Sequence, residues 1–159
     1  KQIMINLHMA PLPEYRGCNQ FSFAIIDGLD FFGTTMHEMD EGIDSGPILF
    51  EKRFSIDKNI FIKDLYEITF KQSLKLFKDS IKDIINESYV KIKQESLLEH
   101  RKTAVYFRSQ IDDLKKINLD WDKEKIDRHL RATLMPGFKG PYINLHGKNI
   151  YFKTEENKD

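Results

Sequence analysis

Short apolar runs near the start of the chain predict two strands separated by a loop and a helix. Residues 1–7 end in an apolar run broken only by Asn6, which is typical of a buried central strand with Asn6 at its carboxyl end. Pro11, Pro13 and Gly17 exclude regular structure over residues 8–18. Asn19 is a favourable N-cap for a helix over residues 19–27, and residues 34–39 then alternate as in a second strand.

One long helix dominates the middle of the chain, and smaller elements follow it. Residues 48–56 predict a third strand whose charges indicate a sheet edge, and residues 62–86 predict the longest helix. Its packing face is predicted from the apolar residues at helical spacing, namely Tyr66, Phe70, Leu74, Phe77, Ile81, Ile84 and Ile85. A polar linker over residues 94–102 precedes two short helices, over 109–116 and 122–133, and a hairpin over 142–153.

This order of elements predicts an α/β fold in two parts. Residues 1–95 form half of an α/β domain, and residues 96–159 form a small appendage of helices ending in a β-hairpin. A strand at the very start of the chain, without a preceding Met, suggests that a further segment comes before it. A lone two-stranded hairpin is marginal in water, so the hairpin is expected to pack on a partner surface or on its own chain.

Composition narrows the possible functions. The 159 residues include 25 Lys and Arg and 25 Asp and Glu, and the resulting formal net charge of zero argues against a generic nucleic-acid binder. The single cysteine, Cys18, excludes a disulfide within the chain and favours a reducing, cytoplasmic setting. No apolar run reaches the ~18 residues of a membrane span, so none is expected.

Asn6 and His8 form the first group of residues with chemical potential. If both are extended, their side chains point the same way, at the end of an apolar strand where ligands bind in open α/β sheets. An amide and an imidazole there can hold and polarise a carbonyl group. Hydrogen bonds from both side chains to the loop backbone are an equally good explanation of this spacing.

The second group is an acidic, glycine-containing segment over residues 37–47. Its acids can line a ligand pocket and assist catalysis, and its glycines permit tight turns. The segment lacks the acid spacing of an EF-hand calcium loop and the second histidine of a metalloprotease helix, so no metal is expected. A solvated acidic turn remains an alternative.

The third group lies in the proline-rich segment before the first helix. Tyr15 offers a flat ring and Arg16 a cation suited to phosphate, and the helix that begins near Asn19 adds an anion-friendly amino end. These features suit a phosphorylated substrate, although an ordinary loop with a surface arginine is also compatible with them. Cys18 is interpreted as a small packed residue.

The three groups together resemble the folate-dependent formyltransferase family. The resemblance is carried by Asn6-Leu7-His8, by the Leu12-Pro13-Glu14-Tyr15-Arg16-Gly17 loop and by Asp44-Ser45-Gly46, in matching order and spacing over nearly the whole chain. The segment from Met9 to Ser22 is most similar to the nucleotide-sugar N-formyltransferases. The resemblance implies that the chain is the C-terminal half of a Rossmann-like formyltransferase sheet with the small appendage.

This resemblance implies roles for individual residues. Asn6, His8 and Asp44 would form the catalytic triad, with a protonated His8 and the Asn6 amide at the oxyanion and with Asp44 favouring the charged imidazole. The backbone of the loop Asp40, Glu41, Gly42, Ile43 and Asp44 would cradle the pteridine of N10-formyltetrahydrofolate, the formyl donor. The residues expected to contact the nucleotide sugar are Met9, Tyr15, Arg16 and Gln20.

The expected reaction is formylation of the amine of a nucleotide-linked, dTDP-type amino-dideoxy sugar used in surface glycans such as the O-antigen of lipopolysaccharide. A homodimer through the C-terminal region is the expected assembly. Two alternatives stay open: methionyl-tRNA formyltransferase, for which a basic C-terminal domain is expected, and a truncated dimerisation or binding remnant without catalysis. The position of the acceptor amine and the nucleotide are not readable from the sequence.

Overall fold

The computed structural model describes residues 3–153, so that Lys1 and Gln2, predicted to open the first strand, lie outside the described residues. It has the mixed α/β character that the sequence predicts. The elements, in chain order, are β1 (Ile5–His8), β2 (Arg16–Gly17), α1 (Gln20–Asp27), β3 (Phe31–Glu38), β4 (Ile48–Ser55), α2 (Ile62–Ile85), the 3-10 helix η1 (Gln94–Leu97), β5 (Val105–Tyr106), α3 (Gln110–Lys115), α4 (Lys123–Thr133), β6 (Tyr142–Leu145) and β7 (Lys148–Tyr151).

The central sheet has the order β1-β3-β4, and both neighbouring pairs are antiparallel. Among residues 3–153, β1 pairs on one side only, with β3, so the strand predicted to be central is an edge strand in this structure. Its apolar run suits a strand covered on both faces, but apolar pattern alone does not say how many neighbours a strand has. The register places Asn6 opposite His37 and His8 opposite Thr35.

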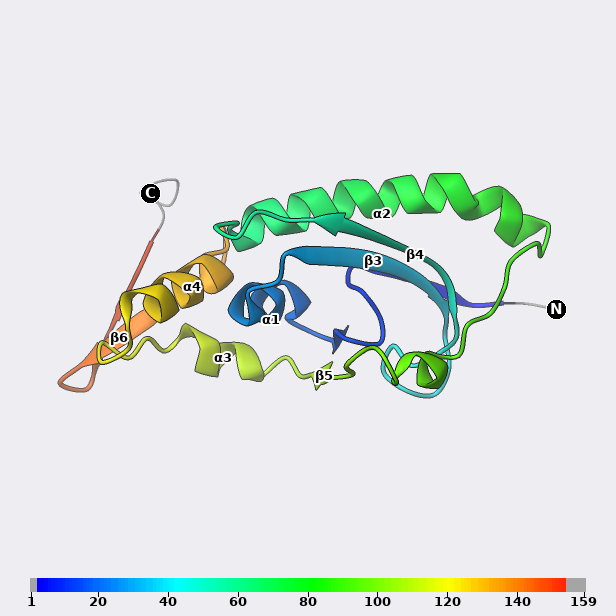
Figure 1. The fold of residues 1–159 in the computed structure, drawn as a ribbon. Coiled ribbons are helices and arrows are strands. Elements are labelled where there is room, and N and C mark those ends of the chain that lie inside the picture. The colour runs from blue at the N-terminus through cyan, green and yellow to red at the C-terminus, as the bar shows by residue number, and fades with distance from the viewer. Residues whose placement is uncertain (1–2, 154–159) are drawn as a thin grey trace.

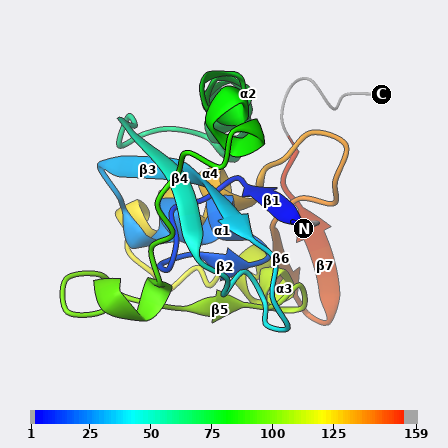
Figure 2. The same ribbon diagram turned by 90° about the vertical axis from the view of Figure 1, so that its right-hand side faces the viewer.

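Two layers enclose this sheet. Helix α2 runs along one side of β3 and β4, and α1, β2 and β5 lie on the other side (Figures 1 and 2). Side chains alternate along β3 accordingly, because neighbouring residues of a strand point to opposite faces. Thr34 Oγ1 lies 2.7 Å from Ser73 Oγ of α2, whereas Thr35 Oγ1 donates to the carbonyl of Ala10 in the proline-rich loop.

The buried face of α2 differs from the predicted one. Leu65, which is fully buried, and Leu76 face the protein, together with the small polar residues Thr69, Ser73 and Ser80. The aromatic and leucine positions that the periodicity selected are exposed by a third or more in the chain described here, namely Tyr66, Phe70, Leu74 and Phe77, and Ile85 is exposed still more. Thr69 and Ser73 can be buried because Thr69 Oγ1 donates to the Leu65 carbonyl and Ser73 bonds Thr34.

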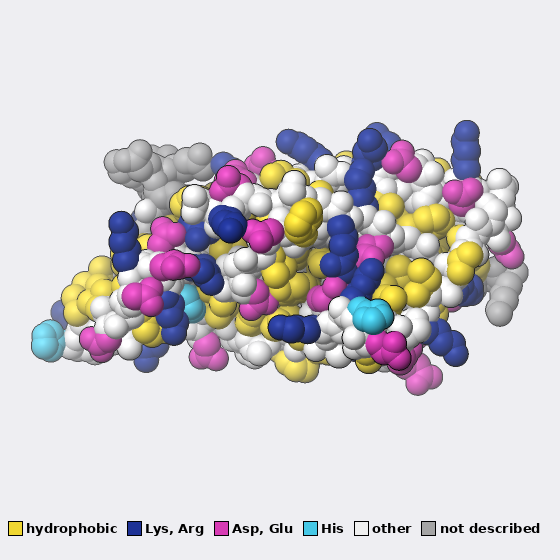
Figure 3. Space-filling view, viewed as in Figure 1, with side chains coloured by type: hydrophobic (Ala, Val, Ile, Leu, Met, Phe, Trp, Pro, Cys, Tyr) yellow, Lys and Arg dark blue, Asp and Glu magenta, His cyan; other side chains and the backbone are white. Residues whose placement is uncertain are grey.

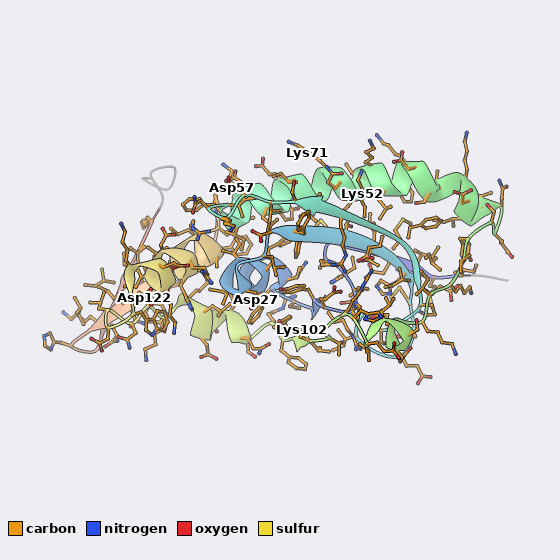
Figure 4. The ribbon with its side chains drawn as sticks, viewed as in Figure 1. Asp27, Lys52, Asp57, Lys71, Lys102 and Asp122 are labelled. Carbon is orange, nitrogen blue, oxygen red and sulfur yellow. The ribbon has the colours of Figure 1, made fainter. Side chains whose placement is uncertain are left out.

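The face shown in Figure 3 has no single dominant charge. Figure 3 shows Lys and Arg side chains interspersed with Asp and Glu and with apolar patches across the face in view. Lys71 lies on the outer side of α2, away from the sheet (Figure 4). Over residues 3–153, no helix combines the length and apolarity that a membrane crossing requires.

The segment after residue 95 packs against the first part instead of standing apart. Strand β5 pairs in parallel with β2, and the Asn19 side chain donates to the carbonyls of Phe107 and Arg108 instead of capping α1 as predicted. In α4, Arg128 donates to the Ile26 carbonyl. The boundary at residue 95 therefore remains a prediction based on composition.

The predicted hairpin is present as β6 and β7, which pair from Tyr142–Tyr151 to Leu145–Lys148. It joins its own chain at the open end, where the Ile117 amide donates to the Tyr142 carbonyl. Most of the hairpin is exposed, including Leu145 and Ile150.

The register of α2 can be tested by stability. Leu65→Ala removes a fully buried side chain and should lower the free energy of unfolding by about 2–5 kcal/mol, whereas Phe70→Ala should lower it by less than about 1 kcal/mol. Urea denaturation followed by circular dichroism measures both variants. A larger loss in Phe70→Ala than in Leu65→Ala would mean that the aromatic face, and not the Leu65 face, packs on the sheet.

Candidate active site

Three polar side chains meet on one face of the antiparallel pair β1–β3. Asn6 and His8 are two residues apart within β1, so both point to the same side, as predicted. His37 of β3 lies directly across from Asn6, and the two side chains are 3.2 Å apart, from Asn6 Nδ2 to His37 Nε2. His8 and His37 are both nearly fully buried.

The acidic loop, residues 40–47, folds back over this face. Asp40 Oδ1 accepts hydrogen bonds from the Gly42 amide and the Ser45 hydroxyl, which closes the first turn of the loop. A side chain at Gly46 would collide with the Glu38 carbonyl, so only glycine permits this close return of the chain. Between these turns, Asp44 adopts a left-handed backbone conformation with φ of 46°.

The carboxylate of Asp44 is the point where the loop meets the strands. Its Oδ2 accepts a 2.8 Å hydrogen bond from the Gly17 amide and lies 3.6 Å from His8 Nδ1. Its Oδ1 accepts a 3.2 Å hydrogen bond from Asn6 Nδ2 and lies 3.4 Å from His37 Nε2. Donors from β1 and β2, together with the ring of His37 from β3, therefore converge on one carboxylate.

These donors keep Asp44 ionised. Burial by itself raises the pKa of Asp44, but His37, the charge of His8 and the Gly17 amide more than offset it. The net result lowers the pKa of Asp44 from 3.8 to about 2. At neutral pH the site therefore contains a fixed negative charge beside two imidazoles.

The tautomer of His8 follows from its neighbours. His8 Nε2 lies 2.6 Å from the carbonyl oxygen of Tyr15, and because a carbonyl can only accept, this nitrogen carries a hydrogen. The remaining nitrogen, Nδ1, faces Asp44 and is the one that can gain or release a proton.

Burial determines the charge of His8 in the free site. It lowers the pKa of His8 below its ordinary 6.5 and outweighs the attraction of Asp44 and the Tyr15 carbonyl, while His37 lowers it further. The free site therefore holds a neutral imidazole at neutral pH, whereas the protonated His8 that the resemblance implies is the form beside the oxyanion during the reaction. A neutral Nδ1 beside a carboxylate can accept a proton and be stabilised once it is charged.

His37 completes the site, and it was not among the predicted catalytic residues. Its Nδ1 donates to the Glu38 carbonyl, which fixes the ring with Nε2 toward Asn6 and Asp44. Alternation along residues 34–39 placed His37 on one face of a strand, but the cross-strand register that pairs it with Asn6 is not readable from one sequence. The Asn6 amide nitrogen contacts both Asp44 and His37 in this structure.

The residues expected to contact a nucleotide sugar have varied surroundings. The ring of Tyr15 lies in the core, stacked on Tyr106, and its hydroxyl donates to Asp27, which is labelled on α1 in Figure 4. Tyr15 is only 5% exposed, and burial raises the pKa of its hydroxyl, so this ring is a packing element and not an open binding surface.

Met9, Arg16 and Gln20 remain candidates of differing accessibility. Met9 is half-buried against the core, and Gln20 borders a cavity of about 240 Å³ between α1, α2 and the segment after α4. Arg16 donates from Nε to the Ile43 carbonyl, so it also fastens the acidic loop.

Four of the five predicted folate-binding residues lie on the outer side of the same loop, whereas the fifth, Asp44, points its carboxylate inward at His8 and Asn6. Asp40, Glu41, Gly42 and Ile43 are exposed, and hydrogen bonds from Ser45 and Gly42 outweigh slight burial and lower the pKa of Asp40. Between residues 3 and 153, no group of three or more His, Cys, Asp or Glu side chains is arranged to hold a metal ion.

The depressed pKa of Asp44 predicts an acid-sensitive contribution to stability. Its folded pKa lies below its unfolded one, so the contribution is present above about pH 4 and is lost as pH falls through about 2, an effect of about 2 kcal/mol between pH 5 and pH 2. Asp44→Asn should flatten the acid arm of the stability profile by this amount in urea titrations. Glu41→Gln, in an exposed acid of the same loop, is the matched control, and a parental acid arm in Asp44→Asn would contradict the proposed network.

The chain is similar in sequence to curated formyltransferases. The chain is 29% identical to methionyl-tRNA formyltransferase from Caldicellulosiruptor saccharolyticus over 92% of its length and 46% of the relative's. It is 28% identical to GDP-perosamine N-formyltransferase from Brucella melitensis over 95% of its length and 56% of the relative's. The chain thus spans about half the length of these curated relatives.

A solved structure agrees in fold. The N-formyltransferase from Helicobacter canadensis, in complex with folinic acid and dTDP-3-aminofucose, superposes with a TM-score of 0.78 at 28% identity, covering 92% of this chain and 52% of that one. The family model described as formyl transferase matches residues 1–81, which hold Asn6, His8, His37 and the whole acidic loop. Because that match covers more than half of the 159 residues, the chain belongs to the formyl transferase family.

Proposed function

We propose that the full protein transfers a formyl group from N10-formyltetrahydrofolate to the primary amine of a nucleotide-linked amino sugar. The observation that carries this proposal is the convergence of Asn6, His8 and Asp44, with His8 Nδ1 and Asp44 Oδ2 3.6 Å apart and Asn6 on the same carboxylate. A relative of similar fold was solved with a folate and an amino sugar nucleotide, which supports both substrate classes.

The proposed chemistry uses His8 as a base. Its neutral Nδ1 accepts the proton that the attacking amine loses as the new carbon–nitrogen bond forms, and Asp44 stabilises the imidazolium. Asn6 Nδ2 donates to the oxyanion after exchanging its contact with His37 or Asp44. His8 then returns the proton to the folate nitrogen as its bond to the formyl carbon breaks, so protons balance over the cycle.

The folate is proposed to lie against the acidic loop. Glu41, Gly42 and Ile43 are exposed, and the Ile43 side chain, 48% exposed, offers an apolar contact for a flat pteridine. Asp40 maintains the shape of the loop from inside. Met9, Arg16 and Gln20 are the proposed contacts on the nucleotide-sugar side.

A dTDP-linked sugar is the proposed acceptor, and synthesis of a surface glycan such as an O-antigen the proposed role. The Helicobacter relative was solved with dTDP-3-aminofucose, whereas the Brucella relative is named for GDP-perosamine, so the nucleotide is a choice between these two. The cytoplasmic location remains a proposal that rests on the unpaired Cys18.

Methionyl-tRNA formyltransferase is the second candidate, since relatives of that name match at similar identity. The formal net charge of zero favours the sugar acceptor, because tRNA binding usually requires an excess of basic residues. The direct test offers the full protein N10-formyltetrahydrofolate with dTDP-linked 3-amino and 4-amino sugars, GDP-perosamine or methionyl-tRNA, and follows the products by mass spectrometry. Formylation of a sugar nucleotide supports the proposal, and formylation of methionyl-tRNA alone refutes it.

His8→Asn should remove most of the activity of the full enzyme. Losing the base and its charge at the oxyanion should lower kcat by ~10²–10³-fold with a smaller change in KM. The exposed His100 gives the control His100→Asn, which should keep the parental rate. Parental turnover in His8→Asn would exclude the proposed role.

We further propose that the protein is a homodimer through the hairpin β6–β7. The hairpin exposes Leu145 and Ile150, and a two-stranded hairpin that is largely exposed gains stability from a second surface. Light scattering at micromolar concentration should show a dimer that Ile150→Glu converts to monomer, while Lys148→Glu, at an exposed position of the same hairpin, leaves it intact. A monomeric parent would contradict the dimer.

A further inference from the structure

Residues 91–94, which lead from α2 into η1, contact the acidic loop and its two ends at three points. Before the loop, Lys91 forms an ion pair with Glu38 at the end of β3. After the loop, Ile92 exchanges backbone hydrogen bonds with Ile48 at the start of β4. Between these anchors, Gln94 reaches the interior of the loop itself. Gln94, the first residue of the polar linker predicted over residues 94–102, therefore contacts the loop that carries Asp44.

Gln94 has the surroundings of a core residue. It is 4% exposed, and its Nε2 donates two hydrogen bonds of 2.8 Å each, to the carbonyls of Asp44 and Gly46. The orientation of the amide is fixed by this chemistry, because the opposite orientation would place its oxygen against two carbonyl oxygens. Its Oε1 is buried and has no partner among the described residues.

A buried acceptor without a partner disfavours the folded state, so this side chain is poorly suited to stability alone. Its two hydrogen bonds instead fix the backbone on either side of Asp44. Asp44 holds a left-handed backbone, with φ of 46°, that L-residues seldom adopt without help. By fixing the carbonyls of residues 44 and 46, the amide holds the peptide units that aim the Asp44 side chain at His8 and Asn6.

We propose that Gln94 is a positioning residue for catalysis, which fixes the backbone of Asp44 and thereby the aim of its carboxylate at His8 and Asn6. The expected effect of Gln94 on the rate rests on the proposed formyl transfer. The expected effect of Gln94 on the geometry of the ligand-free site does not. Gln94 touches no reacting atom and acts through Asp44. Without the two hydrogen bonds, the loop stays anchored by Lys91 and Ile92, and Asp44 loses its fixed direction.

The test removes the two donors with little change of volume. In the full protein, Gln94→Met should lower kcat by ~10–100-fold, the effect of a misplacement of about 1 Å at a catalytic group, with KM changed less than threefold. Glu95→Gln, at the next and exposed residue of η1, is the matched control and should keep the parental kcat.

A second readout does not depend on the reaction. In the ligand-free protein, imidazole NMR signals should show His8 titrating at lower pH in Gln94→Met, because the negative charge that favours its protonation is less well aimed. A parental kcat together with a parental His8 titration would overturn the positioning role. A shifted titration in a protein that transfers no formyl group would keep the positioning role and refute the proposed function instead.

If Gln94→Met fails to fold, Gln94→Asn keeps an amide but shortens its reach by one methylene. This variant should show the same lowered kcat and shifted His8 titration as Gln94→Met. Parental values of both in Gln94→Asn would overturn the proposal.

Discussion

The carboxylate of Asp44 is the group on which the arrangement of the site depends. It ties the loop that follows β3 to β1 through Asn6 and His8, and to β2 through the Gly17 amide. These groups come from β1, β2 and the loop after β3, so the site forms only when the three segments pack together. The charge that draws them together also sets their chemistry, because it favours a proton on His8 that burial alone would exclude.

The fold supplies two independent supports for this carboxylate. From the sheet side, antiparallel register places His37 across from Asn6, and alternation sends Thr34 to α2 and Thr35 to the proline-rich loop. From the outside, Arg16 fastens the Ile43 carbonyl and Gln94 fastens the carbonyls of Asp44 and Gly46. A loop of glycines and acids, flexible in isolation, is thereby held at the residues on either side of the reactive group.

Local sequence patterns predicted most helices and strands correctly. They gave wrong predictions for features that depend on contacts between distant parts of the chain. The short helix ending at Gly28, the strand around residues 34–39, the long helix and the hairpin all formed close to their predicted places. The face of α2 was predicted wrongly because Thr69 and Ser73 are polar in sequence, yet their hydroxyls find partners in Leu65 and Thr34. The helical periodicity depends on hydrophobicity alone, so it does not predict that hydrogen bonds will allow polar residues to be buried.

The same limit applies to the site. Motif spacing identified Asn6, His8 and Asp44, and the structure brings all three together. Tyr15 was predicted to contact a substrate because it offers a flat ring beside Arg16, but its ring is buried and stacks on Tyr106, ninety-one positions later. His37 and Gln94 carry no local signal, since their roles come from cross-strand register and from a contact across fifty positions.

The most direct test of this account is the ionisation of Asp44 itself. Carbon-13 NMR of the labelled side-chain carboxyl, followed through an acid titration of the ligand-free protein, reports that pKa without reference to any reaction. We expect a pKa of about 2 for the Asp44 carboxyl, well below the ordinary 3.8. The NMR signals of the His8 ring should shift over the same pH range. An Asp44 carboxyl with a pKa near 3.8 would show that the groups of β1, β2 and β3 do not converge on it. That result would contradict the proposed catalytic arrangement.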